Sequence, residues 1–388
     1  MTDVNRLLLD VLNELTCYIR EEDFAGWDPY DGLNSEVFNV LPFKNNSYYR
    51  LVFSQLLKRC PFNLRPFLII RKERNPKGIA LFASGFFNLY KILKKEEYLK
   101  EGATLLSWLE NMKRTDFSGF GWGYNFPWQS RYHYKPKFYP NAVVTSFVGQ
   151  SFLDGYNTTE NSKYLEIAKK AADFLLNEVM VVDDDSVYFS YSPSDSSQVI
   201  NVTALVSVFL AHLHYYTQDA LLRSVASRGI KFVIKKQNED GSWYYGTKKY
   251  QQWIDNFHTA FNLLSLKQFS QYINDFNFRE ELKKAYDYYT KTFFMEDGRV
   301  KYYNDKLYPI DIHAIATAII TLSKFGDIDL AKRVLNWAIK HMWDKEKKYF
   351  YFQKHRLYTI KISYMRWSQA WMFLALTEFL KDLRKCSG

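Results

Sequence analysis

Six segments of the chain share a pattern in which a small polar residue stands directly before small and apolar residues with helical spacing. The six polar residues are Asn75, Asn141, Asn201, Asn256, Asp311 and Ser363. They follow one another at intervals of 66, 60, 55, 55 and 52 residues. Each side chain can accept a hydrogen bond from the first turn of a helix, so each is predicted to be a helix cap. Such repetition is typical of a repeat architecture or a closed array.

A second, more amphipathic helix is predicted before each capped helix. These helices cover residues 7–19, 98–109, 164–176, 221–234, 282–293 and 331–342. They carry apolar residues at three- and four-residue intervals, whereas the capped helices contain more small residues and fewer charges. Small side chains permit close approach, so we expect the capped helices to form an inner ring. The predicted fold is all-α, an (α/α)6 toroid of six helical hairpins that spans residues 1–388 as a single domain.

Long aromatic segments lead from each amphipathic helix to the following capped helix. They cover residues 117–140, 181–200, 237–255, 295–310 and 343–362. Several contain an Asp-Gly pair or a charged turn between alternating aromatic residues, which predicts short β-hairpins. Because all of them lead into inner-helix N-termini, we expect them on one face of the toroid. That face is the predicted active site.

The charge of the chain favours an anionic partner. Its formal net charge is +10, and 18% of its residues are aromatic. The Lys and Arg residues are scattered, without a basic helix or an arginine-rich tract, so we expect no nucleic-acid partner. An anionic glycan, a phosphorylated carrier and a lipid headgroup fit the charge equally well.

The sequence also predicts a cytoplasmic location. Cys17, Cys60 and Cys386 are isolated, which argues against a disulfide framework and favours a reducing compartment. The N-terminal stretch contains Asp10 and Asn13 among its apolar residues, so it is predicted to be an amphipathic helix. No window reaches the ~20 apolar residues of a membrane span. The oligomeric state is left open.

One short motif, QNEDGSW at 237–243, resembles the glutamine–tryptophan repeat of squalene–hopene cyclases, whose toroids also have two rings. The acidic motif of that class is missing, because the acidic turn at 183–186 lacks its spacing. Similar toroids that hold zinc use Cys and His, and no cysteine here lies near a His-bearing capped helix. We therefore expect no metal and no cofactor.

A broader resemblance covers most of the chain. Its segments are WDPYDGLNS (27–35), NLRPFL (63–68), NFPWQSR (125–131), WIDNFHTAF (253–261) and YMRWSQAWM (364–372). They are similar to segments of a family associated with bacterial and archaeal polysaccharide-biosynthesis clusters. The resemblance implies the fold of six-hairpin glycosidases and related toroidal lyases and epimerases. It also implies a glycan or glycan-lipid intermediate as the partner.

Two Asp–His pairs stand at the predicted mouth of the ring. Asp255 and His258 lie three residues apart at the start of an inner helix, so they share a face. Asp311 and His313 repeat the arrangement one hairpin later. A carboxylate beside an imidazole holds its tautomer and raises its basicity, as general acid–base catalysis requires. Each Asp could instead serve only the helix N-terminus.

The six caps, aligned on one another, single out the fourth and fifth hairpins. The residues two positions after the caps are Lys77, Val143, Thr203, His258, His313 and Met365. A purely architectural repeat does not need two histidines at this position. We therefore expect the active site at these two hairpins, with residues 117–140 as their lid.

The long loops supply the predicted substrate-binding residues. The candidates are Trp128, Arg131, Tyr139, Trp243 and Tyr245, and Tyr139 is also a candidate catalytic acid. Trp and Tyr faces stack on sugar rings, and Arg pairs bidentately with a carboxylate or a phosphate. The alternative for residues 119–128 is a packed aromatic hairpin.

Further candidates stand at the ends of inner helices and after the first helix. Asn141, Asn201 and Asn256 are candidate binding residues. Asp28 and Asp31 could act as acid and base or bind a cation, although their segment is also a strong turn sequence. Arg366 and Trp367 lie near the start of the last inner helix, where a buried Arg needs a ligand or an ion pair. Its ion-pair partner would be Asp31 or Asp255.

Three functions fit these residues. The first is an enzyme acting on an anionic glycan, either by hydrolysis, which needs two facing carboxyl groups, or by elimination or epimerisation of a uronic acid. For the latter reactions, Arg131 or Asn256 would neutralise the carboxylate, with His258 as base and Tyr139 as acid. The second is a non-catalytic glycan- or partner-binding protein. The third is an isoprenoid cyclase-like enzyme with an aromatic cavity and a buried acid.

Overall fold

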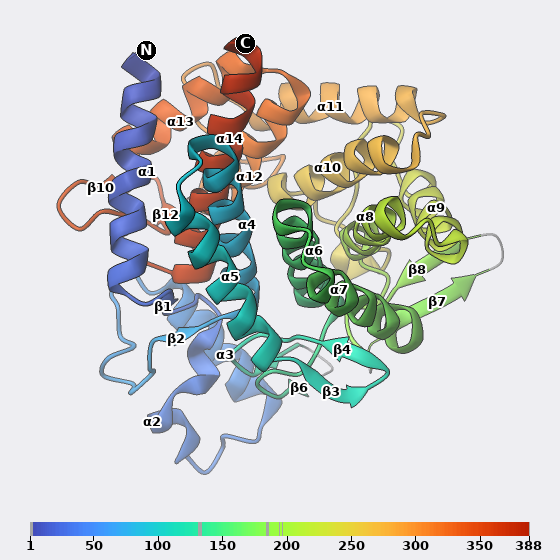
Figure 1. Cartoon of the computed structure of the whole chain (residues 1–388). Coiled ribbons are helices and arrows are strands. Elements are labelled where there is room, and N and C mark those ends of the chain that lie inside the picture. The colour runs from blue at the N-terminus through green and yellow to red at the C-terminus, as the bar shows by residue number, and fades with distance from the viewer. Residues whose placement is uncertain (1–2, 131–133, 184–185, 194, 196, 388) are drawn as a thin grey trace.

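In the computed structural model the chain folds into two concentric rings of helices (Figure 1). The structure describes residues 3–130, 134–183, 186–193, 195 and 197–387. Within them, the inner ring consists of α4 (Pro76–Leu93), α6 (Ala142–Thr159), α8 (Ile200–Thr217), α10 (Asn256–Ile273), α12 (Ile312–Phe325) and α14 (Trp371–Ser387). Each of these helices contacts the next, and α14 contacts α4, so the ring is closed.

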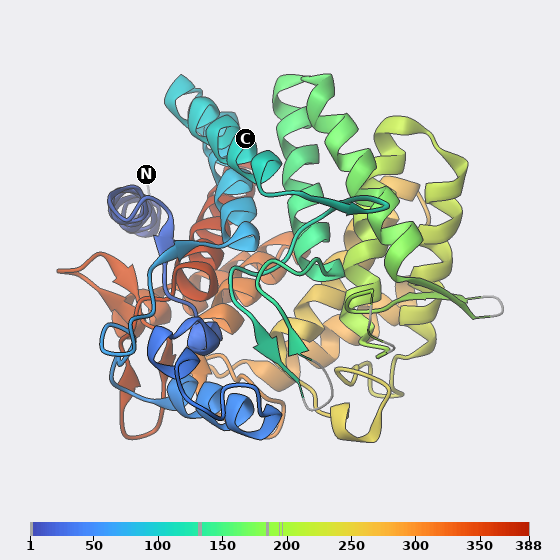
Figure 2. The same cartoon turned by 90° about the horizontal axis from the view of Figure 1, so that it is seen from below.

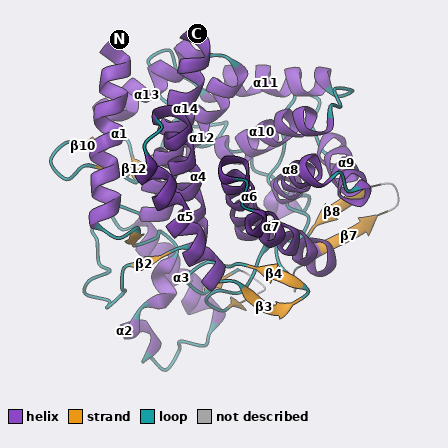
Figure 3. Ribbon diagram, in the orientation of Figure 1, coloured by secondary structure: helices purple, strands orange, loops and turns teal. Residues whose placement is uncertain are grey.

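The outer ring is built from the amphipathic helices. In the described part of the chain these are α1 (Asp3–Glu21), α5 (Glu96–Asn111), α7 (Ser162–Phe174), α9 (Ala220–Lys235), α11 (Arg279–Phe293) and α13 (Ile328–Met342). Helix α1 packs on α14, and each of the others packs on the inner helix next to it in sequence. Figure 3 shows how fully helices dominate the molecule. The predicted (α/α)6 toroid is confirmed.

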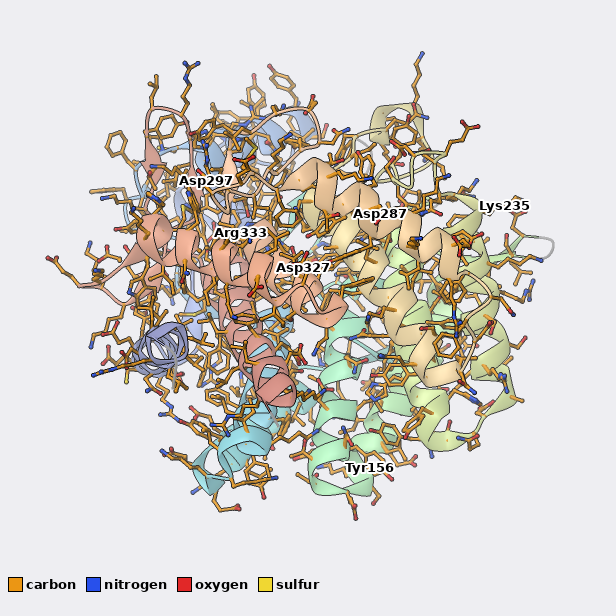
Figure 4. All side chains as sticks on the ribbon, turned by 90° about the horizontal axis from the view of Figure 1, so that it is seen from above. Tyr156, Lys235, Asp287, Asp297, Asp327 and Arg333 are labelled. Carbon is orange, nitrogen blue, oxygen red and sulfur yellow. The ribbon has the colours of Figure 1, made fainter. Side chains whose placement is uncertain are left out.

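The two rings differ in the way their surfaces are buried. Charged residues such as Lys235, Asp287 and Arg333 on the outer helices are exposed (Figure 4). Inner helices are buried on almost every side and approach one another closely. A Cβ atom at Gly85 would lie 2.5 Å from the ring of Phe373 in the neighbouring helix. This close approach explains why the inner helices are rich in small residues.

None of the described helices is long and apolar enough to cross a membrane.

Short antiparallel hairpins follow the outer helices, as predicted. They pair β3 (Arg114–Phe117) with β4 (Gly119–Gly121), β5 (Trp128–Gln129) with β6 (Tyr134–Lys135), β7 (Met180–Asp183) with β8 (Ser186–Phe189), and β10 (Trp343–Asp344) with β11 (Tyr349–Phe350). A three-stranded sheet joins β9 (Ile310–Asp311), β12 (Gln353–Lys354) and β13 (Thr359–Ile360). Residues 237–255 instead form turns and the 3-10 helix η3 (Lys249–Gln251). In the view from below, several of these loops lie in front of the helices (Figure 2).

The connection from α1 to α4 contains helices that the sequence analysis did not predict. They are η1 (Asp31–Asn34), α2 (Glu36–Asn39) and α3 (Ser47–Arg59), framed by the paired strands β1 (Ala25–Gly26) and β2 (Glu73–Arg74). Helix α3 begins after Asn46, whose side chain accepts the N–H of Tyr48. In Figure 1 these segments lie below the ring, beside β3 to β6.

Three of the six predicted helix caps are confirmed. The side chain of Asn75 accepts from Lys77 and Gly78, that of Asn141 accepts from Val144, and that of Asp311 accepts from His313. Each of these bonds satisfies an N–H group of the first turn that has no partner within the helix.

The other three predicted caps are wrong. Asn201 lies inside α8, which begins after Val199 without a side-chain cap. Helix α10 is capped by Asp255, one residue before Asn256. Ser363 precedes a π-helix, η4 (Met365–Ala370), and receives a hydrogen bond from Gln369 instead. The apolar pattern located each helix, but at these three the predicted cap lies one or two residues from the observed one.

Candidate active site

The loop side of the ring contains a cavity of about 600 Å³, which we call the loop-face cavity. Every inner helix, or the π-helix before it, supplies lining residues. These are Lys77, Val143, Asn201, Phe257, His258, Phe261, His313, Arg366 and Trp367. Loops and α3 add others, among them Tyr30, Lys58, Tyr124, Trp128, Tyr191, Asp195, Tyr245, Lys248, Trp253, Asp255 and Tyr302. The cavity lies on the face where the sequence predicts the active site.

His258 is held by Asp255. Its Nδ1 donates to Oδ2 of Asp255 at 2.7 Å, while Oδ1 accepts the backbone N–H of His258 at 3.0 Å. The indole N–H of Trp253 also donates to Oδ2, at 3.1 Å. A carboxylate at Nδ1 keeps the proton there and leaves Nε2 as the basic nitrogen. The His258 side chain is 20% exposed and lines the cavity, so a ligand can reach it.

His313 presents a second imidazole to the same cavity. It is 1% exposed, and neither ring nitrogen has a hydrogen-bond partner among the described residues. Its ring packs on Phe257 and Trp367, with both ring centres 4.5 Å away. Burial, with the positive charges of Lys77 and Arg366, holds the pKa of His313 well below its usual value. A buried polar group without a partner is costly, so a ligand that bonds this ring relieves that cost.

The two Asp–His pairs are not equivalent, contrary to the prediction. His258 stands three residues after its cap Asp255, whereas His313 stands two residues after its cap Asp311. Side chains three apart share a helix face, and side chains two apart do not. From His313, Asp311 accordingly accepts only the backbone N–H, at 2.8 Å. Its carboxylate also accepts the indole N–H of Trp367 at 3.0 Å and the side-chain amide of Gln353 at 2.6 Å. Asp311 is fully buried outside the cavity lining, and burial raises its pKa to about 6.

Aromatic side chains form the walls of the cavity. Trp128 meets Tyr191 edge to face at 5.6 Å, and Tyr245 stacks on Trp253 at 4.4 Å. The ring of Tyr245 also lies 4.6 Å from that of His258. Ring faces of this kind stack on sugars. Of the aromatic residues predicted in the loops, Trp128 and Tyr245 therefore lie in the cavity wall.

Two buried ion pairs lie beside the cavity. Arg366 donates to both oxygens of Asp28, at 2.6 and 2.8 Å, and Arg65 donates to Asp31 at 2.7 Å. The prediction that Arg366 pairs with Asp31 or Asp255 is wrong, because its partner is Asp28. Asp28 and Asp31 lie outside the cavity lining, and burial raises the pKa of Asp31 to about 6. Among the described residues, no group of three or more His, Cys, Asp or Glu is arranged to hold a metal ion.

Two of the predicted loop residues lie away from the cavity lining. Tyr139 packs on Phe117, with ring centres 6.0 Å apart. Trp243 is 2% exposed and donates its indole N–H to the carbonyl of Val233 at 2.9 Å. It is therefore a core residue, placed by packing rather than by a ligand. Arg131 lies outside the described residues.

The three predicted asparagines have different surroundings. Asn141 caps α6 and is 1% exposed, outside the cavity lining. Asn256 points to the outer ring, where its Oδ1 accepts the hydroxyl of Tyr289 at 3.0 Å. Asn201 lines the cavity, and its buried Oδ1 has no partner within the described residues. Only Asn201 is in position to meet a ligand.

The cavity lining is positively charged, and the sequence analysis missed most of the residues responsible. Its cations are Lys58, Lys77, Lys135, Lys248 and Arg366, and its carboxylates are Asp195 and Asp255. Lys58 belongs to α3, a helix without a repeat signal. In the alignment of the six predicted caps, Lys77 occupies the same position as His258 and His313, two residues after the cap. Its burial depends on distant segments, so spacing alone did not distinguish it from a surface lysine.

A second cavity of about 780 Å³ lies among the C-terminal halves of the inner helices, and we call it the opposite-end cavity. Its carboxylates and its histidine are bonded to neighbouring side chains. Glu378 accepts from Asn88 at 2.6 Å, and Asp154 accepts from Ser84 at 2.6 Å. His212 contacts the side-chain amide of Gln150 at 2.6 Å. Phe261 lines both cavities.

Known structures share the toroid. Cellobiose 2-epimerase from Bacillus thermoamylovorans B4167 superposes with a TM-score of 0.65 at 13% identity, covering 81% of this chain and 90% of the epimerase. The GH76 α-mannanase BT2949 of Bacteroides thetaiotaomicron gives a TM-score of 0.62 at 13% identity, covering 81% and 88%. Unsaturated glucuronyl hydrolase from Bacillus sp. GL1 gives 0.62 at 15% identity, covering 98% and 96%.

The sequence itself gives no such match. No protein-family model matches the chain. No curated protein matches it in sequence. At 11–15% identity the structural similarity shows the fold alone, an (α/α)6 toroid.

Proposed function

We propose that the protein is a carbohydrate-active enzyme that moves a proton to and from a sugar carbon in the loop-face cavity. The observation that carries this proposal is the contact of 2.7 Å between His258 and Asp255. It leaves Nε2 of His258 as a base that faces a cavity with aromatic walls. The structurally similar proteins named above include an epimerase, a mannanase and a uronyl hydrolase, which supports a carbohydrate substrate.

His258 would abstract a proton from a carbon next to a carbonyl or carboxylate group, in an epimerisation or an elimination. The negative charge would then develop on the adjacent oxygen. His313 is neutral at neutral pH because burial and nearby cations oppose its protonation. A neutral imidazole can donate an N–H to a developing oxyanion, and both nitrogens of His313 lack a partner among the described residues. The Phe257 ring contacts both imidazoles, with ring centres 4.0 Å from His258 and 4.5 Å from His313.

Hydrolysis fits the geometry less well. Both hydrolytic mechanisms need two carboxyl groups on either side of the scissile bond. The carboxylates of the described lining are Asp195 and Asp255. Asp255 accepts hydrogen bonds from Nδ1 and the backbone N–H of His258 and from the indole N–H of Trp253. Asp195 accepts both the N–H and the hydroxyl of Ser197. Neither is placed as a free acid.

The other two predicted functions are also less well supported. A carbocation intermediate in an isoprenoid cyclase would be disfavoured by a described lining in which cationic side chains outnumber carboxylates. A binding protein has no need of an imidazole whose proton is fixed by a buried carboxylate. The cationic lining supports an anionic glycan, and a role in polysaccharide biosynthesis stays a prediction from the sequence resemblance.

The experiment is proton exchange at sugar carbons. Reducing disaccharides and uronate-terminated oligosaccharides are incubated with the protein in D2O and followed by NMR. We expect deuterium at a carbon next to a carbonyl or carboxylate, and a loss of 10²–10⁴-fold in rate in His258→Gln with an unchanged thermal unfolding curve. No exchange and no product across the panel, or full activity in His258→Gln, would contradict the proposal.

A further inference from the structure

Lys77 is a buried cationic side chain at the floor of the loop-face cavity. It is the second residue of α4 and is 3% exposed. Its Nζ lies 4.2 Å from the ring centre of Phe147, 5.2 Å from that of Trp371 and 5.6 Å from that of Phe261. No described carboxylate forms an ion pair with it, although it lines the cavity. A buried amine of this kind normally has a hydrogen-bonded or charged partner.

The groups facing Lys77 from neighbouring elements cannot supply that partner. Arg366, from η4, is positive and disfavours a second charge beside it. Asp28 is the carboxylate whose field reaches Lys77, but both of its oxygens accept from Arg366 at 2.6 and 2.8 Å. His313, from α12, has two unpartnered nitrogens and accepts no proton readily. Among the described residues the floor therefore offers Lys77 no free carboxylate, and the neutral ring of His313 adds one N–H donor and one acceptor nitrogen.

We propose that this floor binds the carboxylate of a uronic acid residue, with Lys77 as its ion-pair partner and His313 as its second donor. The inference rests on the proposed function, since it names the substrate class of the same cavity. A carboxylate offers two acceptor oxygens, one for each donor. A monoanion matches the single unpaired ammonium, whereas a phosphate dianion would leave a negative charge among the rings of Phe147, Phe261 and Trp371.

Binding of the carboxylate should take up a proton. Burial and Arg366 hold the pKa of Lys77 well below its usual value, so the free protein carries a larger fraction of neutral amine here than at an exposed lysine. An opposite charge within ~4–6 Å favours the ammonium form. The uronate is already ionised at pH 8, so the proton comes from the buffer. This uptake distinguishes Lys77 from an exposed lysine, which is charged before the ligand arrives.

The test is calorimetric titration of the full chain at pH 8 in HEPES and in Tris, whose ionisation enthalpies differ. The two probes are the disaccharide β-glucuronosyl-1,4-glucose and cellobiose, its neutral match. We expect the acidic disaccharide to bind at least tenfold more tightly than cellobiose. We also expect its binding enthalpy to depend on the buffer, as uptake of up to one proton requires, whereas that of cellobiose should not.

Three variants separate the role of Lys77 from general charge. Lys77→Met should lose both the preference for the acid and the proton uptake. Lys77→Arg should keep the preference without the uptake, because a guanidinium is always charged. Lys267 is the matched control, since its Nζ lies 4.3 Å from the Phe325 ring at the opposite end. Lys267→Met should change neither quantity.

The outcomes are distinct. Equal affinity for the two disaccharides, persistence of the preference in Lys77→Met, or no proton uptake in the wild type would overturn the inference. In those cases, turnover that depends on His258 would leave the proposed function standing. Tighter binding of glucose 6-phosphate than of glucuronate would assign the floor to a phosphate. Failure of every carbohydrate to bind or react would overturn both proposals.

Discussion

The two ends of the ring hold cavities of similar size, and these cavities differ in how their polar side chains are paired. At the opposite end, about 780 Å³ is bordered by carboxylates bonded to neighbouring side chains, such as Glu378 with Asn88 at 2.6 Å, although the indole N–H of Trp371 there has no described partner. At the loop face, about 600 Å³ is bordered by His313, whose two ring nitrogens have no described hydrogen-bond partner, and by Lys77, which forms no ion pair with a described carboxylate. Polar side chains that are hydrogen-bonded to one another stabilise the fold, whereas unpaired polar groups remain able to bind a ligand. The comparison therefore assigns stability to one end and binding to the other.

The largest expected effect separates two histidines. His258→Gln should lower the turnover rate of the sugar by 10²–10⁴-fold, about 3–5 kcal/mol in the barrier, because the base is lost. His212→Gln, at the opposite end, should change it by less than threefold. Steady-state rates on the substrate found in D2O check both variants. Equal losses in the two variants would abolish the functional distinction between the ends.

The next effect is on stability and belongs to the opposite end. Glu378→Gln should lower the free energy of unfolding by about 3 kcal/mol, because Lys324 loses a buried partner. The affinity for sugar should stay unchanged. Denaturant unfolding and sugar titration check the two statements, and a stable variant with weakened sugar binding would contradict them.

The acid dependence of the same variant sharpens the test. The charges of Lys324 and Lys381 lower the pKa of Glu378 to about 2, against an ordinary value of 4.5. A depressed folded-state pKa gives stability that is present above the unfolded pKa and lost as pH falls from about 4.5 to about 2. Glu378→Gln should lack this portion of the acid destabilisation. Unfolding curves between pH 6 and pH 3 measure the difference.

At the loop face, removal of a charge should stabilise the protein. Lys77→Met should raise the free energy of unfolding by about 1 kcal/mol at pH 7, because the buried amine no longer has to be kept neutral or unpaired. The folded-state pKa lies below the unfolded value of 10.5, so the unfolded chain binds more protons over that interval. The gain should therefore shrink as pH rises toward about 10. Destabilisation by Lys77→Met would show that this end is also optimised for stability.

The smallest effect concerns the aromatic wall. Trp128→Ala should weaken sugar binding by about 1 kcal/mol, or roughly fivefold, through loss of a stacking face. Tyr272→Ala, which removes the ring stacked on His212 at 4.2 Å in the opposite-end cavity, should leave sugar affinity unchanged. Titration of both variants with one sugar measures the contrast.

The sequence predicted the architecture better than the details of the helix ends. Amphipathic and small-residue helices alternate because they face different surroundings, and this periodicity survives without knowledge of any distant contact. Cap positions depend on local turn geometry. Because the observed cap is Asp255 and not the predicted Asn256, His258 stands three residues after its cap instead of two. That single residue explains why His258 reaches its carboxylate and His313 does not.

The candidate site was predictable where its residues act locally. Asp255 and His258 interact across one helical turn, so their spacing predicted their contact. Arg366 pairs with Asp28, 338 positions away in the chain, and no local pattern distinguishes that partner from Asp31. Lys77 went unrecognised for the same reason, because the rings of Phe147, Phe261 and Trp371 that bury it come from three other helices.

The most direct measurement is a crystal structure of the protein soaked with β-glucuronosyl-1,4-glucose. The account predicts the disaccharide in the loop-face cavity, with its carboxylate within hydrogen-bond distance of Lys77 and a sugar carbon within reach of Nε2 of His258. A disaccharide bound in the opposite-end cavity, or in the loop-face cavity without contact to His258, His313 or Lys77, would contradict it.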